Sequence, residues 1–171
     1  YELSDRYQRR TYKWLREAGL ANNKTFASLQ TNALLKAQQT TLAKLQQDID
    51  WAHRADNVLL IGPSGPGKTQ IANALGHRWV EQGVRCKLFP AIALVQLLQQ
   101  AKRDLDLMSA MTRLDKYRVL IIDDIGYVKK TDAETHILFE FIAHRYESGS
   151  LIVTANQPFS EWDQIFPDSI M

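Results

Sequence analysis

Beyond residue 56, four short segments recur along the chain with the length and apolar content of strands. The segments lie at residues 58–61, 84–89, 119–122 and 151–153. Apolar residues at helical spacing separate them, over 70–82, 94–101, 102–116 and 132–146. This alternation predicts an α/β fold with three layers, in which helices cover both faces of a parallel sheet.

The first 55 residues have a different pattern, because their apolar positions fit helices with no strand between them. Helical spacing covers residues 4–18 and, in a stretch rich in Gln, Leu and Ala, residues 31–55. Gly19 is placed to end the first helix, and Asn22-Asn23 marks a turn. We therefore divide the chain into an N-terminal helical segment with a linker, 1–55, and an α/β core, 56–171.

The stretch between the first strand and the next helix carries a nucleotide signature. Residues 62–69 match the phosphate-binding pattern G-x-x-x-x-G-K-[ST] at every fixed position. In such a loop, backbone N–H groups and the helix N-terminus converge on phosphate oxygens. We expect Lys68 to reach the β- and γ-phosphates and the Thr69 hydroxyl to bind Mg²⁺. The residues expected to bind the nucleotide are Gly62, Pro63, Ser64, Gly65, Pro66, Gly67, Lys68, Thr69 and Gln70.

The third strand ends in two carboxylates, Asp123 and Asp124. Because the carboxyl ends of parallel strands meet at one edge of a sheet, this Walker B element should lie beside the bound nucleotide. Asp123 is the expected acid of the Mg²⁺ shell, and Asp124 the expected base for the attacking water. Asn156 follows the fourth strand at the same edge, where its amide can hold that water or the γ-phosphate. Catalysis is thus assigned to Asp124, Asn156 and Lys68.

Five cations of the first helix fall within an arc of about 120° at 100° per residue. They are Arg6, Arg9, Arg10, Lys13 and Arg16. Two interpretations stay open: a surface that contacts the phosphates of nucleic acid, or the solvated face of an ordinary amphipathic helix. Leu3, Tyr7, Trp14 and Ala18 form the neighbouring arc, which suits packing against a helix or the core.

Charge and cysteine content narrow the class of protein. The net charge is +2, and the positive excess is N-terminal: residues 1–56 hold 9 Lys/Arg against 6 Asp/Glu, and residues 57–171 hold 12 against 13. A lone cysteine, Cys86, excludes a disulfide within the chain and favours a reducing cytoplasm. No apolar run approaches the roughly 18 residues that span a membrane. The four histidines show no metal-ligand spacing.

With both Walker elements and Asn156, the chain resembles an AAA+ ATPase, more narrowly the clade of the initiator DnaA and the helicase loader DnaC. It is most similar to the IstB-type transposition helpers. Beyond the Walker motifs, the resemblance is carried by Gly126-Tyr127, Arg145-Tyr146-Glu147 and Pro158-Phe159-Ser160-Glu161-Trp162, and upstream by residues 16–20 and 24–26. It spans most of residues 16–171.

The resemblance implies an ATPase, with ATP and Mg²⁺ as cofactors, that assembles as a helical or ring-like homo-oligomer on duplex DNA. It would assist a partner transposase, with the N-terminal helices serving oligomerisation and DNA contact and Asn156 in the sensor-1 role. Relatives continue into a fifth strand and an arginine finger beyond Met171. We therefore expect a fragment that lacks the C-terminal part of the family fold, hydrolyses ATP slowly and leaves the P-loop strand at a sheet edge.

Two departures from the family pattern keep other functions open. Asp124 stands where AAA+ proteins more often have Glu, and Pro66 removes an N–H from the phosphate loop. Both suit an ATP-gated DNA scaffold that hardly hydrolyses the nucleotide. Within the same fold, a DnaC-like replicative helicase loader is the other alternative, and it should prefer single-stranded DNA.

Overall fold

A parallel sheet forms the centre of the molecule. The computed structural model describes residues 2–65, 67–127, 131–146, 148–158 and 160. Within them, the strands are β1 (Val58–Ile61), β2 (Cys86–Pro90), β3 (Val119–Asp123) and β4 (Ser150–Ala155), in the order β1-β4-β3-β2. β3 and β4 lie in the middle and are buried along their whole length. The predicted parallel α/β sheet is confirmed.

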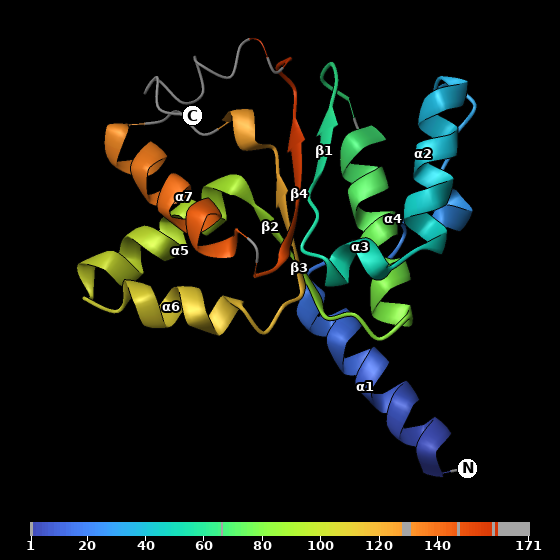
Figure 1. Cartoon of the computed structure of the whole chain (residues 1–171), viewed down its shortest axis with the longest axis horizontal. Coiled ribbons are helices and arrows are strands. Elements are labelled where there is room, and N and C mark those ends of the chain that lie inside the picture. The colour runs from blue at the N-terminus through green and yellow to red at the C-terminus, as the bar shows by residue number, and fades with distance from the viewer. Residues whose placement is uncertain (1, 66, 128–130, 147, 159, 161–171) are drawn as a thin grey trace.

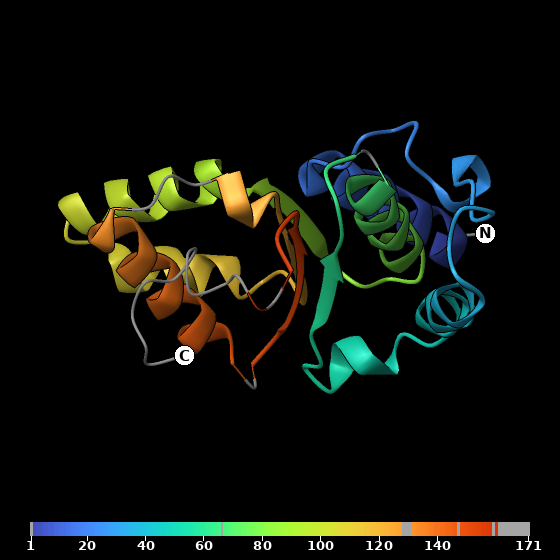
Figure 2. The ribbon, with the colours of Figure 1, turned by 90° about the horizontal axis from the view of Figure 1, so that it is seen from above.

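Helices cover both faces of this sheet, as expected (Figures 1 and 2). One face carries α4 (Gly67–Glu81), α2 (Lys36–Gln47), α3 (Asp50–His53) and the end of α1 (Glu2–Ala18). The other carries α5 (Ala91–Arg103), α6 (Leu107–Leu114) and α7 (Asp132–Arg145). Successive residues of β3 point to opposite faces, so Ile121 joins the first core and Ile122 the second. This is why the central strands are continuously apolar.

β1 lies at the edge of the described sheet and pairs in parallel with β4. Its register places Ile61 beside Ala155, so the two strands end together where the phosphate loop begins. Burial alternates along β1, and Leu59 remains 48% exposed. The expected edge position of the P-loop strand is confirmed. An exposed apolar edge strand is open to pairing with another chain.

The single helix predicted over residues 31–55 is wrong. α2 begins only at Lys36, α3 covers Asp50–His53, and the chain between them is extended at Asp48. The Asp48 carboxylate accepts the Asp50 N–H at 2.8 Å, so it caps the start of α3 instead of continuing α2. The break turns Trp51 into the core, where its ring meets Trp79 edge-on at 4.5 Å between centroids.

The helical pattern over residues 102–116 is also interrupted. α5 ends at Arg103, and the Asp106 N–H donates back to the Ala101 carbonyl at 2.8 Å. This Schellman-type ending requires a left-handed residue, and Leu105 supplies it with φ 56°. Leu105 is therefore 95% exposed, whereas Met111 of α6 is buried. α4 ends in the same way at Gly83, with φ 83°.

Two short 3₁₀ helices complete the described elements, η1 (Phe26–Ser28) and η2 (Ile125–Tyr127). α7 has a capping box in which Thr131 and Glu134 bond each other's backbone, at its predicted start. The sequence also predicts a short helix over residues 161–166, with Ser160 as its N-cap. This range lies outside the described residues, and so does Pro66.

Candidate nucleotide-binding site

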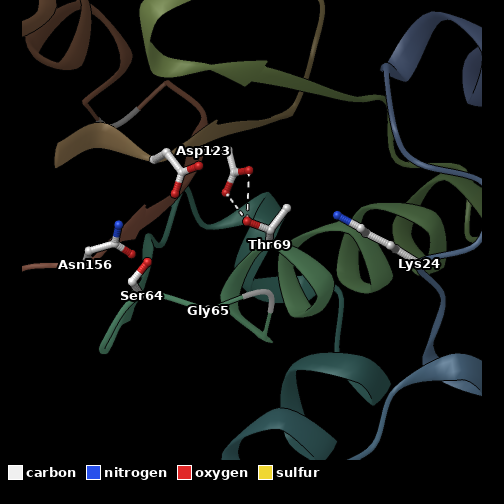
Figure 3. A pocket seen from close by; sticks show the side chains of 7 residues that line it. Lys24, Ser64, Gly65, Thr69, Asp123 and Asn156 are labelled. Atoms are coloured by element: carbon white, nitrogen blue, oxygen red, sulfur yellow. Dashed lines mark hydrogen bonds between the residues drawn. The ribbon is translucent and has the colours of Figure 1, made fainter. Parts of the chain in front are cut away.

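A polar cavity of about 410 Å³ lies at the carboxyl edge of the sheet, beside the N-terminus of α4 (Figure 3). Its lining comes from the ends of β3 and β4, the phosphate loop and the N-terminal linker. The lining residues are Lys24, Ser64, Gly65, Thr69, Asp123, Asp124 and Asn156. Of these, all but Lys24 are site residues predicted from the sequence. The structure thus brings residues more than 90 positions apart in the chain into one cavity.

The phosphate loop has the open shape that an anion needs. The Gly62 N–H donates to the Ala155 carbonyl at 3.2 Å, which ties the start of the loop to β4. A Cβ on Gly62, Gly65 or Gly67 would meet no heavy atom within 4 Å. These glycines are therefore not required by packing within the chain; they leave space beside backbone N–H groups, as a phosphate cradle requires.

Lys68 folds back on the loop, where its Nζ donates to the Pro63 carbonyl at 2.6 Å. A side chain held in this way can move to a phosphate oxygen, which is a stronger partner for an ammonium group. The Gln70 side chain does not face the cavity, since its amide donates to the Ser28 carbonyl at 3.0 Å. For Gln70, the expected nucleotide contact is thus limited to the backbone.

Thr69 and Asp123 lie in direct contact, as expected of two groups that share a metal ion. The Thr69 hydroxyl lies 3.1 and 3.0 Å from the two carboxylate oxygens of Asp123 (Figure 3). The Asp123 side chain is nearly buried, at 8% exposure. A hydroxyl and a carboxylate at this spacing form an oxygen donor set of the kind that Mg²⁺ prefers. The residues present therefore fit the ion.

Thr154 fixes the geometry of both carboxylate residues, and sequence reasoning missed it. Its hydroxyl donates to Asp123 at 2.5 Å and accepts the Asp124 N–H at 2.8 Å. Thr154 is fully buried in the last part of β4. The available signal was a hydroxyl residue inside an apolar strand, two positions before Asn156.

Asp124 has a strained backbone, with φ 60°. Such outliers concentrate at functional sites, and Asp tolerates this region better than most residues. Burial raises the pKa of its carboxyl, the Asp123 charge adds to this, and the charges of Lys68 and Lys24 lower it. Asn156, half-buried, lies across the cavity from Lys24 (Figure 3). The site thus holds an acid and an amide where a water molecule could be positioned.

Lys24 is the second residue that sequence reasoning did not assign to the site. It belongs to the linker between α1 and η1, and in Figure 3 its ammonium group points toward Thr69. The available signal was only its place in the stretch Lys24-Thr25-Phe26, which follows a turn. No spacing rule connects that stretch to a P-loop.

The five cations of α1 lie elsewhere. α1 extends away from the sheet (Figure 1), and all five are exposed. Arg9 pairs with Asp5 at 3.9 Å, and Lys13 with Glu17 at 4.0 Å. Arg10 lies over the rings of Tyr7 and Trp14. Of the neighbouring apolar arc, Ala18 is buried and Trp14 packs against the core. The Tyr7 hydroxyl donates to the Glu81 carbonyl of α4, whereas Leu3 is 84% exposed, so the expected packing fails only at the start of the helix.

Within the described part of the chain, no group of three His, Cys, Asp or Glu side chains is placed to hold a metal ion. None of the helices described is both long enough and apolar enough to cross a membrane.

Comparison with known proteins identifies the family. The family model described as "IstB-like ATP binding protein" matches residues 1–171. The chain is 42% identical, over all of its 171 residues, to an insertion sequence ATP-binding protein of Sinorhizobium fredii, and covers 57% of that protein. It is 32% identical over 170 residues to the IS21 ATP-binding protein of Pseudomonas aeruginosa, covering 99% of the chain and 64% of that protein. The chain therefore spans about 60% of the length of these relatives.

Solved structures agree on the fold. The DnaC helicase loader is similar with a TM-score of 0.68 at 17% identity, covering 84% of this chain and 83% of that one. DnaI is similar with a TM-score of 0.70 at 14% identity, and the match covers 87% of this chain and 82% of DnaI. At these identities the likeness establishes the AAA+ fold alone. Together with the family match, it shows that the chain belongs to the IstB-like ATP-binding proteins of insertion sequences and has the AAA+ fold of DnaC and DnaA.

Proposed function

We propose that this chain binds ATP with Mg²⁺ in the cavity at the sheet edge and hydrolyses it. The observation that carries the proposal is the contact of Thr69 and Asp123 directly beside an open phosphate loop. Thr69 and Asp123 would hold the ion, which neutralises phosphate charge when it is bound. The loop N–H groups and Lys68 bind the phosphates, Asp124 accepts a proton from the attacking water, and Asn156 orients that water.

In the cell, this ATPase would act as a transposition helper. The names of the relatives place them in insertion sequences, which supports a partner transposase and duplex DNA as the target. The exposed cations of α1 supply a surface of suitable charge for the DNA backbone. The exposed edge of β1 would suit assembly into a helical or ring-like homo-oligomer.

The direct test is ATP turnover and ATP binding by the chain, with and without duplex DNA, in wild type and Lys68→Ala. We expect the variant to lose most of its ATP affinity, because it loses a charge-assisted contact worth about 1.5–3 kcal/mol. Lys36→Ala, at an exposed position of α2, serves as the matched control and should bind ATP normally. Wild-type protein that does not bind ATP would overturn the proposal.

The same assays separate the alternatives. Tight ATP binding with no turnover under any DNA condition would favour the ATP-gated scaffold. A preference for single-stranded over duplex DNA would favour a helicase loader, for which the present support is the fold shared with DnaC.

A further inference from the structure

We infer that Lys24 contacts the terminal phosphate of bound ATP, so that the linker after α1 distinguishes a nucleoside triphosphate from a diphosphate. This inference rests on the proposed function, since it names an additional ligand-binding residue of the same cavity. Among the described residues that line the cavity, Lys24 is the one that is cationic, and it shares the lining with Asp123 and Asp124.

The position of Lys24 favours the terminal phosphate over the others. The loop and the start of α4 provide the N–H groups for the inner phosphates. Lys24 instead points toward Thr69 from the side of the cavity opposite Asn156 (Figure 3). It lines the same cavity as Asp124, the residue placed for the attacking water. A cation near Thr69 and Asp124 therefore lies where the phosphate farthest from the nucleoside would end.

Three side chains of the P-loop helix hold the backbone around Lys24. Asn73 accepts the Ala21 N–H at 2.8 Å, and His77 donates to the Ala21 carbonyl at 2.9 Å. Gln70 donates to the Ser28 carbonyl at 3.0 Å. At positions i, i+3 and i+7, these side chains share one face of α4. The Lys24 N–H then donates to the Ala21 carbonyl at 3.1 Å, so the turn that presents Lys24 is fixed on both sides.

The same contacts join this turn directly to the phosphate loop. The Asn73 amide also donates to the Thr69 carbonyl at 2.7 Å, so one buried side chain bridges Thr69 and Ala21. Leu20 packs so closely on Gly76 that a Cβ there would lie 2.7 Å from the Leu20 Cδ2. Such close packing shows that the turn is built against α4. With its backbone ordered before the ligand binds, Lys24 loses mainly side-chain freedom on contact.

The competing explanation for Lys24 is that it only offsets the negative charges of Asp123 and Asp124. The two explanations differ in whether Lys24 affects the preference for a nucleoside triphosphate over a diphosphate. The experiment measures the affinities of Lys24→Ala, Lys24→Arg and Lys36→Ala for a non-hydrolysable ATP analogue and for ADP, at fixed Mg²⁺. For Lys24→Ala we expect the affinity for the ATP analogue to fall roughly tenfold, because a hydrogen bond to a charged group is lost. The affinity for ADP should stay within about twofold. Lys24→Arg should retain most of the preference for the ATP analogue, and Lys36→Ala should match wild type.

Equal weakening of both nucleotides in Lys24→Ala, or no weakening of either, would overturn the inference. Circular dichroism and thermal unfolding establish that each variant is folded, and Lys24→Gln provides a second variant that removes the charge but keeps a polar side chain. Lys68→Ala should lose affinity for both the ATP analogue and ADP, so it shows what general damage to the nucleotide site looks like in this assay. Wild-type protein that binds neither nucleotide would refute the proposed function itself, whereas normal discrimination by Lys24→Ala would refute the role of Lys24 alone.

Discussion

The nucleotide site and the part of α1 before its last turn are both rich in charge, but they differ in how their charged groups are held. At the site, the Asp123 carboxylate is nearly buried and bonded to the hydroxyls of Thr69 and Thr154. On α1, Arg9 and Lys13 are exposed and make only i,i+4 pairs at 3.9 and 4.0 Å. Exposed ion pairs at this spacing stabilise a helix by only about 0.3–0.5 kcal/mol each.

The difference indicates two kinds of function. A site whose polar groups are fixed by the core is ready for a small ligand that needs exact geometry. A helix with exposed cations suits a repeating, sequence-independent partner such as a DNA backbone. The last turn of α1 joins this helix to the core that carries the site, because Glu17 pairs with Arg85 at 2.5 Å and its carbonyl accepts from Lys87 at 2.7 Å.

The largest difference between the two regions should appear in ATP turnover, when Asp124→Asn at the site is compared with Arg9→Ala on α1. The amide keeps the size of the side chain but cannot accept the proton, so we expect turnover to fall by roughly 10² to 10⁴, with ATP affinity changed only a few-fold. Arg9→Ala should leave DNA-free turnover unchanged. Steady-state ATPase assays and ATP titrations on both variants check this, and near-normal turnover by Asp124→Asn would remove Asp124 from the chemistry.

Side chains of the core and side chains at the start of α1 should also differ in how much they contribute to the stability of the protein. Ile121 is completely buried between β3 and α4, so Ile121→Ala should lower the free energy of unfolding by about 2–5 kcal/mol. Leu3→Ala should change it by no more than about 0.5 kcal/mol, because Leu3 is exposed. Denaturant titration of the two variants measures both values. Comparable losses would mean that the start of α1 packs against something in solution.

If the cations of α1 contact DNA phosphates, each one lost should flatten the plot of log affinity against log salt by roughly 0.9 on duplex DNA. Arg9→Ala and Lys13→Ala test this, and Lys102→Ala, exposed at the end of α5, is the control. Unchanged slopes in folded Arg9→Ala and Lys13→Ala would leave a solvated helix face as the role of these residues.

The smallest expected effect concerns the joint between the two regions. The hydrogen bond from Arg85 lowers the pKa of Glu17 in the folded chain. The stability from this pair is therefore present above the pKa of Glu17 in the unfolded chain and is lost as pH falls through the lower, folded value. Glu17→Gln should cost up to about 1 kcal/mol at pH 7. Denaturant titrations at pH 7 and near pH 3 test this; a difference from wild type that persists undiminished in acid would contradict the ionic explanation.

Much of the fold was predictable because the signals were local. Continuous apolar runs identified buried strands, and the fixed positions of the P-loop identified the start of α4. The errors arose where tertiary contacts decided the outcome. Asp48 and Leu105 break helices that the apolar spacing would continue, the first through a side-chain cap and the second through a left-handed turn.

The residues of the site also fall into two groups, those that the sequence could predict and those that only tertiary contacts reveal. Asp123, Asp124 and Asn156 follow apolar strands, so their shared edge could be inferred from topology. Thr154 and Lys24 could not be assigned, because their roles depend on the register of β4 against β3 and on a turn packed against α4. Whether Pro66 weakens phosphate binding stays a prediction: Pro66→Thr should restore an N–H donor and tighten ATP binding roughly tenfold.

The central claim is that Thr69 and Asp123 hold the Mg²⁺ ion that accompanies ATP in the nucleotide site. The most direct test is calorimetric titration of a non-hydrolysable ATP analogue into wild type and Asp123→Asn, with and without Mg²⁺. We predict that Mg²⁺ tightens binding to wild type by roughly tenfold or more and has little effect on Asp123→Asn, since loss of a carboxylate of the metal shell typically costs 10- to 100-fold in metal affinity. Binding to wild type that ignores Mg²⁺, or an undiminished Mg²⁺ effect in Asp123→Asn, would contradict the claim.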